Sequence, residues 1–447
     1  MNPDVLQRYA APVPRYTSYP TAPHFTDAVN GDTYGSWLGE LPSGAALSLY
    51  LHIPFCDRLC WYCGCTTKAT RQYHPVATYL DFLITELNTV ADRLPAGCRT
   101  VNIHWGGGSP SILQPDDILR LSALLKARFN LTSGTEFAVE IDPGYIDSQR
   151  IAAFAEAGVN RVSIGVQDFS SDVQAAINRP QSVETTRQVV TQFRDAGVRS
   201  VNIDLVYGLP HQTRTSVDQT IAEVIAMAPD RIALFGYAHL PSRLTHQRLI
   251  PDETLPGVTE RFAQANRAAN RLTAAGFRRI GLDHFARPDD HLAQSRVHRN
   301  FQGYTTDAAD ALLGFGTSAI GKLPQGYVQN SAATPDYQRR IAGHGLAIAR
   351  GRALTDEDRA RGFVIERLMC DLAFPADELK VRFPDMAEPL IAEAEAVLES
   401  DTDGLVAPLA NSGIFRVTEK GRIFLRSLCA CFDGYFGQSE TRYSTGV

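Results

Sequence analysis

The chain has 447 residues, of which 44% are apolar and 21% are charged, a composition that excludes a disordered or fibrous protein. Its formal net charge of −6 argues against a general nucleic-acid binder, because such proteins pair many phosphates with Lys and Arg. No uninterrupted apolar stretch of about 18 residues occurs, so we expect no segment that spans a membrane.

The first 46 residues lack a long periodic pattern and are predicted to form an N-terminal arm. The arm contains PRYTSYPTAPHF, which is rich in Pro and Tyr, and a short helical segment around TYGSWLGEL. It either packs on the surface of the protein or covers a substrate cleft. The initial residues lack the basic and apolar regions of a secretory signal, so we expect a cytoplasmic protein.

From residue 47 a strand-then-helix rhythm predicts an α/β fold. The candidate strands are near-continuous apolar runs, as parallel strands covered on both faces require, and span residues 47–53, 100–105, 136–141, 161–166, 201–207 and 231–237. Helices are expected over 76–94 and 183–197, and three helices end in similar glycine segments, at Gly158, Gly197 and Gly276. We expect a partial or full parallel (β/α) barrel, with an open doubly wound sheet as the alternative.

After about residue 345 the rhythm changes to that of a small, mainly helical C-terminal domain. Two helical segments are followed by IFRVTEKGRIFLRSLCACF, which predicts a strand and then a helix. The outline is similar to a winged helix, but the segment is not strongly basic, so we expect no binding to DNA. The predicted organisation is therefore an arm over 1–46, a barrel over 47–344 and a helical or winged domain over 345–447.

The cysteines carry the clearest chemical signal, because half of the eight lie between residues 56 and 65, after the first predicted strand. Such a group indicates a metal or redox site in a reducing cytosol. With the spacing Cys56-x3-Cys60-x2-Cys63, three thiolates on one loop can hold three corners of a [4Fe–4S] cluster. The fourth iron then stays open to a small chelator, such as a sulfonium cofactor with free amino and carboxylate groups.

Two other interpretations of the cysteines stay open. Cys56, Cys60, Cys63 and Cys65 could form a structural zinc site, although four ligands at this spacing would be crowded and zinc sites usually combine two separated pairs. The thiols could also be buried separately. The cluster interpretation differs in its chemistry, because electron transfer into the S–C bond of a sulfonium gives a radical that removes hydrogen from unactivated C–H bonds.

Motifs along nearly the whole chain resemble those of one enzyme family. The segment LSLYLHIPFCDRLCWYCGC is typical of radical S-adenosylmethionine (SAM) enzymes. The segments PRYTSYPT, HWGGGSPS, VEIDP, SIGVQDF, NIDLVYGLP and HRNFQGYTT are similar to those of the oxygen-independent coproporphyrinogen III oxidases, also called coproporphyrinogen III dehydrogenases. The cysteine triad indicates only the superfamily, whereas the CGC ending, the arm and HRNFQGYTT indicate this family.

The resemblance implies that Cys56, Cys60 and Cys63 hold the cluster and that two SAM molecules bind beside it. Gly107 would contact the cluster-bound SAM, and Ile320 its adenine region. The other positions that the resemblance implies as SAM contacts are Tyr50, Tyr62, Gly108, Ser109, Glu140, Gln167, Arg179, Asp204 and Ala238. Of these, Gly108, Ser109, Gln167, Arg179 and Asp204 would contact the second SAM.

Other residues stay ambiguous from sequence alone. His52 is either a core histidine or a partner of the cluster-bound SAM, and Cys65 is not a cluster ligand in this family. Phe301 and Gln302 resemble functional positions but could serve packing alone. Three arginines in family-like segments could bind substrate carboxylates or be structural: Arg15, Arg287 and Arg299.

The segment GFGTSAIG at 314–321 fits the glycine pattern of a dinucleotide-binding turn. Such a turn needs a preceding strand within a βαβ unit, and the segment DAADALL before it is a poor strand candidate. We therefore expect no NAD.

The resemblance implies a radical SAM oxidoreductase of anaerobic haem biosynthesis. Two propionate side chains of coproporphyrinogen III would be decarboxylated to vinyl groups, giving protoporphyrinogen IX. A deoxyadenosyl radical would remove hydrogen from the propionate carbon next to the ring, and loss of CO2 and one electron would leave the vinyl group. The reductant and electron acceptor are not indicated, and we expect a monomer. The alternative is a haem-binding chaperone of the same superfamily, against which the CGC ending and the arm argue.

Overall fold

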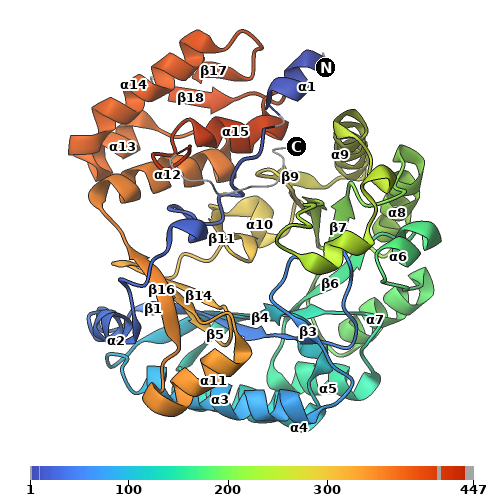
Figure 1. Ribbon diagram of the computed structural model, residues 1–447, viewed down its shortest axis with the longest axis vertical. Helices are drawn as coiled ribbons and strands as arrows, with labels where there is room; N and C mark the ends of the chain where they lie inside the picture. Colours follow the sequence, from blue (N-terminus) through green and yellow to red (C-terminus); the bar gives the residue numbers. More distant parts are fainter. Residues whose placement is uncertain (1–2, 10, 410–413, 438–447) are drawn as a thin grey trace.

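The computed structural model describes residues 3–9, 11–409 and 414–437 (Figure 1). Its centre is a 12-stranded sheet whose middle strands are parallel. In sheet order these parallel strands are β13 (Ala311–Phe315), β1 (Ala46–Ile53), β4 (Arg99–Gly107), β5 (Leu131–Ile141), β6 (Arg161–Gln167), β7 (Ser200–Tyr207) and β8 (Arg231–Gly236). Every strand expected between residues 47 and 237 is therefore confirmed.

Helices connect the parallel strands and cover the outside of the sheet (Figure 1). They are α3 (His74–Ala91), α4 (Pro115–Arg128), α5 (Ser148–Ala157), α6 (Ser171–Ala176), α7 (Val183–Asp195), α8 (Arg214–Ala226) and α9 (Val258–Ala274). Gly158 directly follows α5 and has a φ of 101°, so the prediction of a left-handed glycine at this helix end is confirmed. None of the described helices is long and apolar enough to cross a membrane.

Both edges of the sheet are antiparallel. One edge continues from β13 through β14 (Ile320–Leu323) and β15 (Gly326–Asn330) to β16 (Ile348–Ala353). The other edge continues from β8 through β10 (His284–Ala286) to β9 (Arg278–Ile280). Among the described strands the two edges do not pair with each other, so the barrel is partial and not closed, and the fold is of the expected α/β class.

The expectation of a poor strand before GFGTSAIG was wrong. Ala311–Phe315 form β13, because the apolar run ALLGF can be buried in parallel register beside β1. The chain then turns into the antiparallel strand β14 and not into a helix, so no βαβ dinucleotide-binding unit forms at this point.

The N-terminal arm joins the two large parts of the molecule. Helix α1 (Pro3–Tyr9) precedes Tyr16 and Tyr19, and both tyrosines are buried in the apolar cluster of the C-terminal segment. Helix α2 (Gly31–Gly39) packs instead with the core of the barrel, where Leu38 is fully buried. The arm thus crosses from the C-terminal segment to the barrel (Figure 1).

The C-terminal segment is mainly helical, as expected. It contains α12 (Asp356–Asp371), α13 (Ala376–Arg382), α14 (Pro384–Ser400), β17 (Val406–Leu409), β18 (Ile414–Val417) and α15 (Leu425–Ala430). The remaining elements are β2 (Phe55–Cys56), β3 (Lys68–Ala69), α10 (His291–Gln294), β11 (His298–Asn300), β12 (Gly303–Thr305) and α11 (Thr334–His344). Strand β16 pairs with β15, so the large sheet extends to Ala353, beyond the expected boundary at residue 344. The domain boundaries at residues 46 and 344 stay a proposal.

Candidate active site

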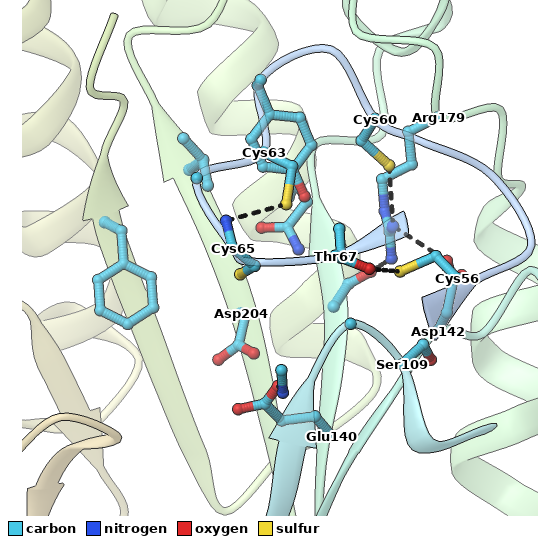
Figure 2. Close-up of a pocket in the computed structure, with 18 of the residues that line it drawn as sticks. Cys56, Cys60, Cys63, Cys65, Thr67, Ser109, Glu140, Asp142, Arg179 and Asp204 are labelled. Carbon is cyan, nitrogen blue, oxygen red and sulfur yellow. Dashed lines mark hydrogen bonds and ion pairs between the residues drawn. The ribbon is translucent and has the colours of Figure 1, made fainter. Parts of the chain in front are cut away.

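A cavity of about 620 Å³ lies at the carboxyl ends of the parallel strands, where barrel folds usually place their sites. The cysteine loop, the glycine run that ends β4 and polar side chains from β5 to β8 surround it (Figure 2). The predicted residues that line it are Cys56, Cys60, Tyr62, Cys63, Gly107, Gly108, Ser109, Glu140, Gln167, Arg179, Asp204 and Ala238.

Two predicted contacts, Tyr50 and Ile320, are not part of this lining. They lie on β1 and β14, the two strands on either side of β13. The hydroxyl of Tyr50 is 3.0 Å from Nδ1 of His52, and Nε2 of the same histidine is 2.9 Å from the carbonyl of Thr66. Burial lowers the pKa of His52, which therefore is a neutral, fully bonded histidine beside the cavity.

Each cysteine of the triad has a polar partner at its sulfur (Figure 2). Thr67 Oγ1 lies 3.2 Å from Cys56 Sγ. Arg179 Nη1 donates to Cys60 Sγ at 3.4 Å, and the backbone N–H of Cys65 donates to Cys63 Sγ at 3.4 Å. Such donors stabilise thiolates, the form in which cysteine binds metals.

The spread of the thiols distinguishes between the metal sites considered from sequence. Within the described part of the chain, no three His, Cys, Asp or Glu side chains are grouped closely enough to hold one metal ion. A zinc ion held by all four neighbouring cysteines would need such a group. The sulfur atoms of Cys56, Cys60 and Cys63 instead lie apart around the wall of one wide cavity, as ligands at separate corners of a [4Fe–4S] cluster require (Figure 2).

The cysteine loop has little secondary structure and is held by side chains that sequence reasoning missed. Gln247, fully buried in a 3-10 helix, donates from Nε2 to the carbonyls of Tyr62 at 2.9 Å and Ala238 at 3.1 Å. The neighbouring His246 places Nε2 2.7 Å from the carbonyl of Cys63. No local motif marks either residue, because their partners in the cysteine loop lie more than a hundred positions earlier in the sequence.

Arg179 is the central cation of the cavity. Its guanidinium forms an ion pair with Asp142 at 3.1 Å and donates from Nη2 to the carbonyl of Gly165 at 2.6 Å. Burial alone would lower the pKa of Arg179, but Asp142 and the thiol of Cys60 raise it above its ordinary value. Asp142 lies in the VEIDP segment and is a further lining residue that the sequence analysis did not assign.

Two carboxylates face the cavity from β5 and β7. Glu140 accepts from Nε2 of His104 at 3.1 Å and from the backbone N–H of Gly107 at 3.1 Å. Burial alone would raise the pKa of Glu140, but these donors lower it, so the group remains an anion. Burial and the charge of Glu140 raise the pKa of Asp204, which accepts from Ser163 at 2.8 Å.

The glycine run allows the backbone to approach the cysteine loop very closely. Gly107 has a φ of 108°, and a Cβ at this position would lie 2.5 Å from the ring of His52. A Cβ at Gly108 would lie 2.5 Å from the carbonyl oxygen of Phe55. Only glycine fits at these two positions, and the exposed backbone N–H and C=O groups can face a ligand.

Of the arginines that the sequence left ambiguous, two reach a second cavity beside the first. Arg15 and Arg299 line it, together with Phe301 and Gln302. Arg287 does not: its Nε donates to the carbonyl of Pro229 at 2.9 Å, which is a structural role.

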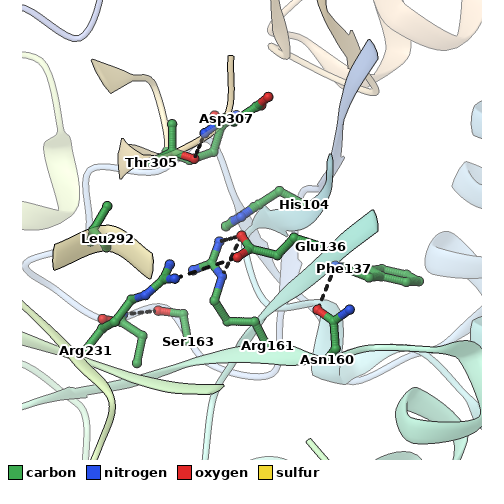
Figure 3. Close-up of polar contacts among 12 residues, drawn as sticks. His104, Glu136, Phe137, Asn160, Arg161, Ser163, Arg231, Leu292, Thr305 and Asp307 are labelled. Carbon is green, nitrogen blue, oxygen red and sulfur yellow. Dashed lines mark hydrogen bonds and ion pairs between the residues drawn. The ribbon is translucent and has the colours of Figure 1, made fainter. Parts of the chain in front are cut away.

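A largely buried ion-pair network joins the middle of β5 to the amino ends of β6 and β8 (Figure 3). Arg161, the first residue of β6, donates from Nε to Oε1 of Glu136 at 2.9 Å. Arg231, the first residue of β8, lies 3.8 Å from the same carboxylate and donates to Asp290 at 2.9 Å. Burial alone would raise the pKa of Glu136, but the two guanidinium groups lower it.

Replacing Glu136 with Gln removes the anion between Arg161 and Arg231. We expect the free energy of unfolding at pH 7 to fall by about 3 kcal/mol, because a buried charge pair loses one partner. Since the folded-state pKa of Glu136 is lowered, its contribution is present above the ordinary value of 4.5 and is lost as the pH falls below it. The difference in free energy of unfolding between E136Q and the wild type should therefore become smaller in acid. Urea unfolding followed by circular dichroism measures it.

The control for this variant is Asp81→Asn, which removes an exposed ion pair with Arg120. It should change the free energy of unfolding by less than about 1 kcal/mol. An equal effect of both variants, or a constant difference between E136Q and wild type across pH, would contradict the prediction.

Comparison with known proteins adds independent findings. The profile of the Radical SAM superfamily matches residues 50–224. The oxygen-independent coproporphyrinogen III oxidase of Bradyrhizobium diazoefficiens is 44% identical over 446 residues, covering 97% of this chain and 97% of that protein. The protein of the same name from Cereibacter sphaeroides is 44% identical and covers 98% of this chain and 97% of its own length. The structure of coproporphyrinogen III oxidase (HemN) from Escherichia coli, described as a radical SAM enzyme, superposes with a TM-score of 0.90 at 39% identity, covering 94% of this chain and 98% of that one.

Proposed function

Because this chain belongs to the oxygen-independent coproporphyrinogen III oxidase family of the radical SAM superfamily, we propose that it converts coproporphyrinogen III into protoporphyrinogen IX by decarboxylating two propionate side chains to vinyl groups. The observation that carries the proposal is the meeting of three cysteine sulfurs, a glycine run and two carboxylates at one cavity. The haem-chaperone alternative is not favoured, because the relatives that match nearly full length are named as oxidases.

The enzyme binds a [4Fe–4S] cluster and SAM. We assign the cluster to Cys56, Cys60 and Cys63, whose sulfurs have the hydrogen-bonding partners described above. When bound, the cluster and SAM supply the one-electron chemistry that removes hydrogen from an unactivated carbon. The protein contributes binding, orientation and charge.

The proposed SAM contacts follow from the chemistry of the lining. The anionic Glu140 suits an ammonium or ribose hydroxyl, and the backbone of Gly107 and Gly108 suits amino and carboxylate groups. Gln167 lines the cavity and has a φ of 68°, a left-handed conformation that is uncommon for a non-glycine residue. We propose that the polar side chains of Gln167, Arg179 and Asp204 bind a second SAM molecule.

Three further properties belong to the proposal. We propose that the protein is a monomer. A cytoplasmic location fits the eight free cysteines. A reductant and an electron acceptor from outside the chain complete the reaction, since each decarboxylation leaves one electron to be removed.

The test is anaerobic incubation of the cluster-containing protein with coproporphyrinogen III, SAM and dithionite. Chromatography of the oxidised tetrapyrroles should reveal a product with two vinyl groups, formed only when SAM is present. Bound but unchanged tetrapyrrole in an otherwise intact, brown protein would contradict the proposal and support the chaperone.

A further inference from the structure

A second cavity, of about 350 Å³, adjoins the first. The two share five lining residues: Arg15, Cys65, Phe235, Gly236 and Tyr237. They therefore form one continuous site, with the cysteine triad in one part and the second cavity beyond the end of β8. Volumes of this size are typical of small-molecule sites.

The charged side chains that line the second cavity are mostly positive. It consists of five arginines and one carboxylate: Arg15, Arg261, Arg279, Arg299, Arg426 and Asp283. They come from the arm, from α9, β9 and β11, and from α15 of the C-terminal segment. Folding alone brings these cations together, since the five arginines are scattered over more than four hundred residues of the sequence.

The single carboxylate is already engaged. Asp283 lies 2.8 Å from Nδ1 of His284 and 3.7 Å from Nη1 of Arg299. Burial alone would raise the pKa of Asp283, but Arg299 and His284 lower it to about 2, so it is an anion at neutral pH. Asp283 therefore pairs with Arg299 and His284 and makes no ion pair with Arg279.

Arg279 combines unmet hydrogen-bonding capacity with the lack of a nearby carboxylate. Its Nη2 donates to the carbonyl of Leu282 at 3.2 Å, and its Nε is buried without a hydrogen-bond partner. Within the described part of the chain it has no carboxylate within 4.0 Å. Burial and the nearby Arg422 lower the pKa of Arg279 to about 10, which reflects the free energy of holding this cation away from water.

Two of the other arginines of this cavity donate to backbone carbonyls at the end of β8. Arg15 donates from Nη2 to the carbonyl of Gly236 at 3.1 Å, and Arg261 donates from Nη2 to the carbonyl of Tyr237 at 2.8 Å. Aromatic side chains, among them Phe235 and Phe301, line the same cavity. An apolar wall combined with several fixed guanidinium groups suits a ring system that carries several carboxylates.

We propose that Arg279, within this arginine group, binds the propionates of coproporphyrinogen III that are not reacting while another propionate reaches the cavity of the cysteine triad. This inference rests on the proposed function, which supplies a substrate with four carboxylates. Only one propionate can face the triad at a time, so the others need cations elsewhere. The product of two turnovers keeps only two of the four carboxylates, so the arginine group as a whole has fewer carboxylates to bind in the product than in the substrate.

The experiment measures binding of coproporphyrin III, the stable aromatic form of the substrate, to cluster-containing protein by quenching of porphyrin fluorescence. Arg279→Gln should raise the dissociation constant by about tenfold or more, because a charge-assisted hydrogen-bond pair is lost. Arg279→Lys keeps the positive charge but loses the planar guanidinium group, so its dissociation constant should lie between those of the wild type and R279Q. In turnover, KM for coproporphyrinogen III should rise more than kcat falls.

The matched control is Arg278→Gln on the same strand, where the side chain is exposed and outside both cavities. It should leave coproporphyrin binding unchanged, and iron content should be equal in all variants. A second measurement needs no variant: the wild type should bind coproporphyrin III at least several-fold more tightly than protoporphyrin IX, which has two fewer carboxylates.

Unchanged coproporphyrin binding by R279Q, or equal binding of the two porphyrins by the wild type, would overturn the inference. These outcomes are independent of the proposed function, which would still stand if the wild type formed the vinyl product. Conversely, weaker binding by R279Q with no vinyl product would support the arginine site and contradict the oxidase activity.

Discussion

A variant with Ser in place of Cys56, Cys60 or Cys63 should lose all measurable turnover and most of its iron. The three sulfurs lie apart around one cavity, so each would hold a different corner of the cluster and none can replace another. A serine hydroxyl is a harder ligand than a thiolate and remains protonated at neutral pH, so it does not hold iron in such a cluster. Iron and sulfide content, the absorption spectrum and reductive cleavage of SAM measure the effect.

Two other cysteines provide controls for the triad. Cys65→Ser should retain the iron content of the wild type, because Cys65 is not one of the three proposed ligands and serine keeps the backbone N–H that donates to Cys63. Cys431→Ser, an exposed position in the C-terminal segment, should retain both iron and turnover. A triad variant that turned over normally, or a C65S protein as poor in iron as the triad variants, would refute the assignment.

The second large effect is expected from Gly108→Ala. Its added methyl group would lie 2.5 Å from the carbonyl oxygen of Phe55 and 2.6 Å from Oγ1 of Thr67. Phe55 directly precedes Cys56, and Thr67 contacts the sulfur of the same cysteine. The loop must move, and since misplacement by about 1 Å can lower a rate by about 100-fold, we expect a loss of at least about that size.

Gly134→Ala is the control for this steric argument. It adds the same methyl group to β5, where nothing lies within 4 Å of the new atom. Iron content, the affinity for SAM and turnover should all fall in G108A and stay unchanged in G134A. Wild-type values for G108A would mean that the close approach of the glycine run to the cysteine loop does not position the site.

The local parts of the fold were predictable from sequence. The apolar runs predicted every parallel strand of the large sheet from β1 to β8, because a strand buried on both faces must be apolar along its whole length. The prediction failed at β13, where the acidic lead-in DAAD masked the short run ALLGF that is buried against β1. A strand of five residues is too short for its apolar pattern to be recognised next to an acidic segment.

The sequence by itself determined the cluster ligands proposed here and the family, because the triad is closed within eight residues and its spacing needs no partner from elsewhere. It did not reveal Gln247, which joins the cysteine loop to the loop after β8, nor the gathering of Arg279 with four other arginines around one cavity. Those contacts connect residues far apart along the chain. Only the packing of the arm, the barrel and the C-terminal segment against one another decides which distant side chains meet, whereas a short loop keeps its ligands together in any fold that contains it.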